Sequence, residues 1–138
     1  MRNPLFLDRI DIQCEITPVP FKDISTAHQG ESSEKIRERV IEARAVQEAR
    51  YKDVKGVYCN AQMNEKMIHT YAKPDTDGLN MLRYAMERLN LSARSYSRIL
   101  KVARTIADLD ASDNITTTHL AEAISYCNLD RGDWAGRG

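Results

Sequence analysis

LNLSARSYSRILKVARTIADLD, residues 89–110, is the stretch that decides the fold of this chain. At 100° per residue its apolar and polar side chains separate onto two sides of a helix. The apolar side holds Tyr96, Ile99, Leu100, Ala103, Ile106 and Ala107. The polar side holds Arg94, Ser97, Arg98, Lys101, Arg104, Thr105 and Asp108. The pattern predicts an amphipathic helix over residues 92–109 that packs on one face and meets solvent on the other.

The first turn of this predicted helix carries a cation. The hydroxyl of Ser92 can cap the free N–H groups of the first turn, which puts Arg94 about two residues inside the helix. Helix N-termini carry partial positive charge and favour anions, so a guanidinium there is mildly unfavourable unless an anion accompanies it. Two interpretations of Arg94 follow from the helix alone: a solvated surface arginine, or a contact to phosphate.

The size and charge of the chain limit the classes of protein to which it can belong. With 138 residues and 42% hydrophobic content, one globular domain is expected. Twenty basic and twenty acidic residues cancel, which argues against nucleic-acid binding through overall positive charge, although a local basic stripe stays open. The chain has neither an apolar run of 18 residues nor a signal-peptide core. We therefore expect a soluble, cytoplasmic protein with no membrane partner.

Cysteine and histidine are few and scattered. Cys14, Cys59 and Cys127 form no C-x-x-C pair, which favours reduced thiols over a disulfide framework. The three histidines are also far apart in the sequence, so no metal site is expected.

The N-terminal segment alternates like a half-buried strand. From Arg9 to Ile16 every second residue is apolar, with Ile10, Ile12, Cys14 and Ile16 on one face. A single strand cannot satisfy its own backbone, and no second strand follows. We therefore expect its partners in a part of the protein outside this sequence, and the chain to be a fragment of a longer protein. Residues 17–32 are rich in proline and small polar residues and are expected to be a loop.

Four further helices are expected. Ser32 or Ser33 caps the first, which runs to about Arg50, and a connection over residues 52–62 turns at Gly56. The other three are expected at about residues 64–72, from the Asp75 cap to Leu89, and from the Thr116 cap to about residue 127. The faces expected to be buried contain Ile36, Val40 and Ala43; Met67, Ile68 and Tyr71; Leu79, Leu82, Met86 and Leu89; Leu120, Ala123 and Ile124. The sequence thus predicts a mainly α fold: a bundle of about five helices preceded by one orphan β-strand.

No catalytic motif occurs in the chain. The P-loop, the dinucleotide-binding glycine pattern, the H-E-x-x-H zinc motif and the nucleophile elbow are all absent. The carboxylate pairs Asp8 with Asp11 and Asp108 with Asp110 are interpreted as ordinary charges at a strand edge and a helix end. This chain alone is therefore not expected to be an enzyme.

Several segments resemble one protein family. They are PLFLDRIDI (4–12), GESSEKIRERV (30–40), YCNAQM (58–63), AMERLNLSARSYSRILKVARTIADL (85–109) and HLAEAISY (119–126). Together they resemble the C-terminal part of magnesium-chelatase-like AAA+ ATPases of the ComM/YifB family. The resemblance extends from Pro4 to Arg131, and the segment around Arg94 is its most specific part.

The resemblance implies an organisation and a function. Residues 1–31 would be the end of the AAA+ core, residues 32–131 a helical lid domain, and residues 132–138 a flexible tail. The parent protein would be an ATPase that uses ATP and Mg²⁺, assembles as a homo-oligomeric ring, expected to be a hexamer, and acts on DNA. Arg9 would be the arginine finger that reaches into a neighbouring subunit, and Arg94 the sensor 2 residue at the γ-phosphate of ATP. The fragment itself, which lacks Walker A and Walker B, would hold no cofactor.

Two other functions stay open. The first is a free-standing helical module that binds nucleic acid or protein through Arg94, Arg98 and Lys101, which share one helical stripe. The alternative interpretation without a binding function is that this stripe is a solvated face, on which Arg104 and Asp108 make an ordinary surface pair. The second is a subunit of magnesium chelatase that inserts metal into a porphyrin.

Overall fold

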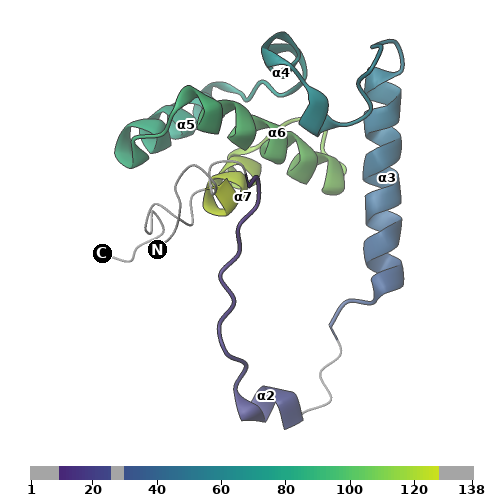
Figure 1. The fold of residues 1–138 in the computed structure, drawn as a ribbon, viewed down its shortest axis with the longest axis vertical. Helices are drawn as coiled ribbons and strands as arrows, with labels where there is room; N and C mark the ends of the chain where they lie inside the picture. The colour runs from purple at the N-terminus through teal and green to yellow at the C-terminus, as the bar shows by residue number, and fades with distance from the viewer. Residues whose placement is uncertain (1–9, 26–29, 128–138) are drawn as a thin grey trace.

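The structure is a computed structural model that describes residues 10–25 and 30–127. In these residues six α-helices and one 3₁₀ turn follow one another (Figure 1). They are α2 (Phe21–Ser25), α3 (Ser33–Tyr51), η1 (Asn60–Gln62), α4 (Glu65–Tyr71), α5 (Thr76–Leu89), α6 (Ala93–Leu109) and α7 (Thr117–Cys127). The helical-bundle prediction is confirmed.

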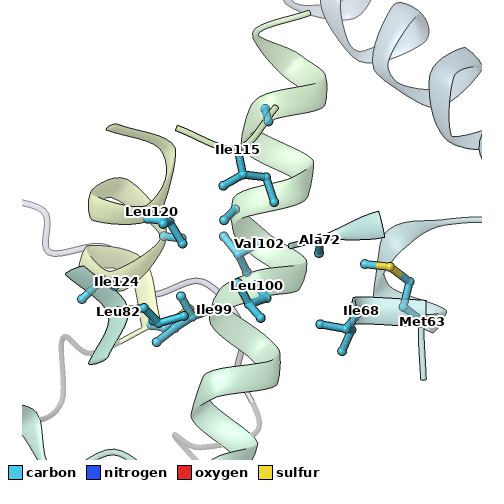
Figure 2. Close-up of a cluster of buried hydrophobic side chains, with 14 of the residues drawn as sticks. Met63, Ile68, Ala72, Leu82, Ile99, Leu100, Val102, Ile115, Leu120 and Ile124 are labelled. Carbon is cyan, nitrogen blue, oxygen red and sulfur yellow. The ribbon is translucent and has the colours of Figure 1, made fainter. Parts of the chain in front are cut away.

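Helix α6 lies at the centre of the bundle. It packs against α7, α3, η1 and α4, and α5 packs in turn on α7. In Figure 2, Leu120 and Ile124 lie to one side of α6, while Ile68 and Met63 lie to the other. The prediction of a solvated polar face on this helix is correct for the exposed Arg94 but wrong for three other residues. The apolar side is buried as expected, but Arg98, Arg104 and Asp108 on the other side are buried as well.

The helix starts are set by local capping, which the sequence predicts for Ser32, Asp75 and Ser92 but not for Asn64. The side chains of Ser32, Asn64, Asp75 and Ser92 each accept a hydrogen bond from a backbone N–H in the first turn of their helix. Helix α5 ends at Asn90, which has a left-handed φ of 51°, and the N–H of Leu91 donates to the carbonyl of Met86 at 3.0 Å. This tight break turns the chain into α6.

A close approach brings α5 onto α7. A Cβ placed on Gly78 would lie 2.8 Å from the Leu120 side chain and 2.8 Å from Cβ of Pro74. Only glycine leaves room for this contact, because real Cβ atoms do not come so close to other heavy atoms. Pro74 also ends the preceding helical segment, as the sequence predicts.

Helix α3 is less packed than its predicted stripe suggests. Ala43 is buried, but Ile36 and Val40 are 42% and 39% exposed. Figure 1 shows why: only the C-terminal part of α3 lies beside the end of α6, and its first turns extend away from the other helices. Burial on α3 is confined to Ala43, Gln47 and Tyr51.

The predicted strand is not formed in the part of it that the structure describes. Residues 10–20 have no regular secondary structure, and Ile12 and Ile16 are 54% and 89% exposed. Alternation stabilises a strand only when a neighbouring strand accepts its hydrogen bonds, and the described residues hold no such neighbour. Arg9 and residues 132–138 lie outside the described residues. The loop predicted over 17–32 contains the short helix α2, which begins directly after Pro20.

None of the helices in the described ranges is long and apolar enough to cross a membrane.

Candidate functional site

A cavity of about 820 Å³ follows the N-terminal half of α6. Arg94, Arg98 and Lys101 line it from α6, Glu65 lines it from the start of α4, and Asp11 from the N-terminal segment. The structure thus brings together the three cations that share a helical stripe in the sequence. It gives each of them a different environment.

Arg94 is the accessible cation of the three. It lies in the first turn of α6, just after Ser92, whose Oγ accepts from the N–H of Ser95 at 3.2 Å. The Arg94 side chain is exposed, and its guanidinium makes no hydrogen bond or ion pair with any residue that the structure describes. An exposed cation that lines a cavity beside open helix N–H groups can receive an anion without first breaking another bond.

Arg98 is buried. Only 7% of the residue is exposed, and its Nη2 donates to the carbonyl oxygen of Cys127 at 3.1 Å. That carbonyl belongs to the last residue of α7, where the helix carries partial negative charge that a cation stabilises. Arg98 therefore connects α6 to the end of α7, whereas the sequence pattern placed it on a solvated face.

Lys101 and Ser97 connect α6 to the other elements that line the cavity. The half-buried Lys101 donates from Nζ to the carbonyl oxygen of Ala61 at 3.2 Å. The hydroxyl of Ser97 donates to Oε1 of Glu65 at 2.6 Å. These bonds attach α6 to η1 and to the start of α4. Of the three cations, Arg94 is the one without a bond to any described residue.

The charges around the cavity favour an anion. Among the described residues of the lining, three cations accompany two carboxylates, Asp11 and Glu65, which leaves one excess positive charge. Among the described residues the lining has no cysteine or histidine, and its hydroxyl groups are those of Tyr96 and Ser97. A net positive lining of this kind is suited to binding an anion.

A second cluster of polar residues lies at the opposite end of α6, around the carboxylate of Asp108, which is 4% exposed. Arg50 donates to both its oxygens, at 2.7 and 2.8 Å, and Arg104 forms an ion pair with Oδ1 at 3.1 Å. Asn60 adds a hydrogen bond from Nδ2 to Oδ2 at 2.9 Å. The interpretation of Arg104 and Asp108 as a surface pair is wrong, because both side chains are buried. Asp108 is bonded to α3 and η1, and Arg104 also donates to the carbonyl oxygens of Ser112 and Asp113.

These contacts shift the pKa values of the charged groups in the cluster. Burial alone would raise the pKa of Asp108, but hydrogen bonds from Arg50 and Asn60 and the charges of both arginines hold that pKa below its usual value. The same hydrogen bond raises the pKa of Arg50. Burial lowers the pKa of Arg104, although the charge of Asp108 opposes this. At neutral pH the cluster therefore holds an ionised carboxylate between two arginines.

Asn60 was missed as a key residue by the sequence pattern. Its Oδ1 accepts from the hydroxyl of Tyr51 at 2.7 Å and from Arg50 at 3.0 Å, and its N–H donates to Gln47 at 2.9 Å. Asn60 is 1% exposed. A polar residue without helical periodicity gives no local signal of burial. Its presence in the quoted segment YCNAQM was the one indication available.

Asp108 and Asp110 have different roles despite their spacing. Asp110 is exposed, and its Oδ2 lies 2.8 Å from Nε2 of His119. The Nδ1 atom of His119 accepts from the N–H of Thr116 at 3.0 Å, while Thr116 Oγ1 accepts from the N–H of His119 at 3.3 Å. His119 thus takes the glutamate position of a capping box at the start of α7. The helix-end interpretation fits Asp110 but not the buried Asp108.

Neither a disulfide nor a metal-binding cluster occurs in the described part of the chain. Cys14 is exposed, Cys59 is half-buried and Cys127 is buried, all as free thiols. No three histidine, cysteine, aspartate or glutamate side chains converge there in a way that could hold a metal ion.

Comparison with known proteins gives a family match over most of the chain. Residues 30–127 match the family described as magnesium chelatase, subunit ChlI C-terminal. This range contains every residue of the cavity except Asp11, and all of the Asp108 cluster.

Individual relatives agree with that match. The chain is 41% identical over 128 residues to the uncharacterized protein YifB of Salmonella typhimurium, covering 91% of this chain and 24% of YifB. It is 39% identical over 122 residues to competence protein ComM of Haemophilus influenzae, covering 88% of this chain and 23% of ComM. An uncharacterized Mycobacterium tuberculosis protein, Rv2897c, is 30% identical over 126 residues, covering 91% of this chain and 24% of that protein. The chain therefore spans about a quarter of the length of these relatives.

Proposed function

This chain belongs to the magnesium chelatase ChlI C-terminal family, and from that premise we propose that it is the helical lid of a larger ATPase similar to ComM and YifB. In this proposal Arg94 is the sensor 2 residue, which contacts the γ-phosphate of ATP. The lid reports the state of the nucleotide to the rest of the protein, which works on DNA. The proposal covers the part of the ATPase that senses ATP, while the catalytic P-loop lies outside this sequence.

The observation that carries the proposal is the environment of Arg94. Its guanidinium is exposed, lines the cavity of about 820 Å³ and has no partner among the described residues, whereas Arg98 and Lys101 each donate to a backbone carbonyl. A cation in the first turn of a helix is unfavourable unless an anion joins it. A terminal phosphate would supply that anion and would also meet the partial positive charge of the α6 N-terminus.

The expected strength of the contact between Arg94 and the γ-phosphate is enough to switch the lid between two positions. A hydrogen bond between a guanidinium and a phosphate oxygen contributes about 1.5 to 3 kcal/mol. It is made with ATP and lost with ADP, so it biases the position of the lid by that amount. Differential affinity of this kind is what allows a ligand to shift a conformational equilibrium.

The rest of the nucleotide site is assigned to other parts of the protein. Binding of Mg²⁺ and of the inner phosphates would fall to the core, which also performs the chemistry. Arg9 is proposed as the arginine finger that acts in trans on the neighbouring subunit of a ring, expected to be a hexamer in the cytoplasm. A guanidinium in that role contributes roughly 10³ to 10⁵ in rate.

The proposal is tested by ATP turnover of the full-length protein that contains this sequence. Arg94→Ala should lower kcat at least roughly tenfold, because the lid no longer registers the γ-phosphate. Arg83→Ala is the matched control, since Arg83 is an exposed arginine on α5 that does not line the cavity, and it should leave turnover unchanged. Turnover of Arg94→Ala at the wild-type level contradicts the proposal.

The alternative is a free-standing module that binds nucleic acid through Arg94, Arg98 and Lys101. Burial of Arg98 against the Cys127 carbonyl weakens it, since one of the three cations is occupied inside the bundle. A titration of the isolated chain with DNA at two salt concentrations separates the two functions. Two phosphate contacts would change log K with log salt by a slope of about −1.8, and the lid function predicts no salt-dependent binding.

A further inference from the structure

The carboxyl end of α7 is joined to two other parts of the chain at once. The Tyr126 carbonyl accepts from the N–H of Gln13 at 2.9 Å, and the Cys127 carbonyl accepts from Nη2 of Arg98 at 3.1 Å. The thiol of Cys127 donates in turn to the carbonyl of Asp11 at 3.2 Å. The last turn of α7 therefore contacts both α6 and the segment 11–13 through directional bonds.

Two of the residues that make these bonds are buried. Arg98 and Cys127 are 7% and 1% exposed. Burial raises the pKa of the Cys127 thiol to about 11, so at neutral pH the thiol keeps the proton that it donates to Asp11. A buried guanidinium and a helix C-terminus also stabilise each other electrostatically. Residues 14–20 are exposed and have no regular structure, and the hydrogen bonds of the Tyr126 carbonyl and the Cys127 thiol join the last turn of α7 to residues 11 and 13.

The attachment lies one helical turn from the proposed sensor. Arg98 follows Arg94 by four residues on α6, and both line the same cavity together with Asp11. Any tilt of the N-terminal half of α6 therefore acts on the Cys127 carbonyl through Arg98. The same helix end holds residues 11–13 through Gln13 and Asp11.

We propose that Arg98 is a positioning residue that couples the α6 sensor turn to residues 11–13 through the end of α7. The inference rests on the proposed function, in which the ATPase core comes before the lid and residues 11–13 are the connection between them. Arg98 acts by holding α6, α7 and this connection in one arrangement. It does not touch the nucleotide.

Kinetics of the full-length protein test this role. Arg98→Met keeps the length of the side chain but removes the donor. It should lower kcat for ATP roughly tenfold with the KM for ATP within about twofold of wild type, because a misplaced sensor impairs the chemical step more than binding. Arg98→Lys, which keeps a cationic donor, should recover part of the loss. An unchanged kcat, or a KM for ATP raised by more than about twofold, overturns the proposal.

A second variant tests the coupling without altering the buried core. Gln13→Pro removes the N–H that donates to the Tyr126 carbonyl and should lower kcat in the same direction. Thr17→Pro is the matched control, since Thr17 is an exposed residue of the same irregular segment, and it should leave kcat unchanged. Equal kcat values for the two proline variants overturn the proposal.

Amide exchange in the 138-residue chain separates this inference from the proposed function. Arg98→Met should speed hydrogen exchange at the Gln13 amide roughly tenfold while exchange in the centre of α6 stays slow. Cys127→Ser, which keeps a donor to Asp11, is the control and should leave Gln13 protected. If Arg94→Ala has wild-type turnover, the proposed function fails, and the exchange result then decides by itself whether the attachment exists. Unchanged exchange at Gln13 in Arg98→Met overturns the attachment.

Discussion

Arg94 and Arg98 are four residues apart on α6, yet their environments are opposite. Arg94 is exposed and without a partner among the described residues, while Arg98 is buried against the end of α7. Helical periodicity assigns both to the same stripe, because it counts positions on one helix and contains nothing about what packs on it. The position of Cys127, 29 residues further along the chain, decides the difference. The environment of Arg94 could be predicted from the sequence, and that of Arg98 could not.

Ala111 offers a test of local backbone conformation. It follows α6 with a left-handed φ of 52°, and the N–H of Ser112 donates to the Ala107 carbonyl at 2.8 Å, as in a Schellman motif. Alanine is strained in this conformation, whereas glycine adopts it freely. Ala111→Gly should therefore raise the free energy of unfolding by about 0.5 to 1 kcal/mol, measured by urea denaturation.

The control for that substitution is Ala49→Gly, on the exposed surface of α3. Glycine inside a helix costs about 1 kcal/mol relative to alanine, so this variant should be less stable than wild type. Destabilisation by both substitutions would contradict the left-handed conformation of Ala111.

The Asp108 cluster holds three elements together. Arg50 from α3 and Asn60 from η1 donate to the carboxylate of Asp108, and Arg104 from α6 forms an ion pair with it. Starts of helices could be predicted from the sequence, because a cap such as Asp75 acts on N–H groups within three residues. The cluster could not, because Arg50 and Asp108 are 58 residues apart and meet only after α3 packs on α6.

Removing the charge of Asp108 tests the cluster. Asp108→Asn keeps the size of the side chain but leaves the half-buried Arg50 and the buried Arg104 without a carboxylate. Loss of one partner from a buried ion pair costs about 3 to 5 kcal/mol. We expect a loss of about 3 kcal/mol in the free energy of unfolding, measured with urea at pH 7. Asp110→Asn, at an exposed position two residues away, should cost far less. Equal losses in the two variants would contradict the role of Asp108 as the buried centre.

The same residue makes stability depend on pH. Because the pKa of Asp108 is lower in the folded than in the unfolded state, its contribution is fully present above the unfolded value of about 3.9. That contribution is lost as the pH falls through the folded pKa. The stability difference between wild type and Asp108→Asn should therefore shrink between pH 7 and pH 3, measured by urea unfolding at both. A difference of the same size at both pH values would contradict the lowered pKa.

At the scale of the whole molecule, packing is concentrated around α6 and thins out along α3. Ile41 and Val46 are 58% and 44% exposed, whereas Ile99 and Ala103 are completely buried. The stripe predicted on α3 failed because periodicity shows which residues share a face, not whether another element covers it. The strand predicted over residues 9–16 failed in its described part for a related reason, since a strand needs a neighbouring strand.

This gradient predicts the pattern of hydrogen exchange. Amides in the first half of α3 should exchange faster than those of α6, because local opening costs little where few contacts are lost. The difference should be at least roughly a hundredfold between residues 36–42 and residues 99–105, measured by mass spectrometry of peptides from the two regions. Equal protection would show that the first half of α3 is packed in solution.

The central claim is that Arg94 contacts the γ-phosphate of ATP, and the most direct measurement compares ATP with ADP binding. In the full-length protein, Arg94→Ala should weaken ATP binding roughly 10- to 100-fold and leave ADP binding unchanged, because only ATP carries the γ-phosphate. Arg83→Ala should change neither affinity. An equal loss for both nucleotides, or no loss for either, would contradict the claim.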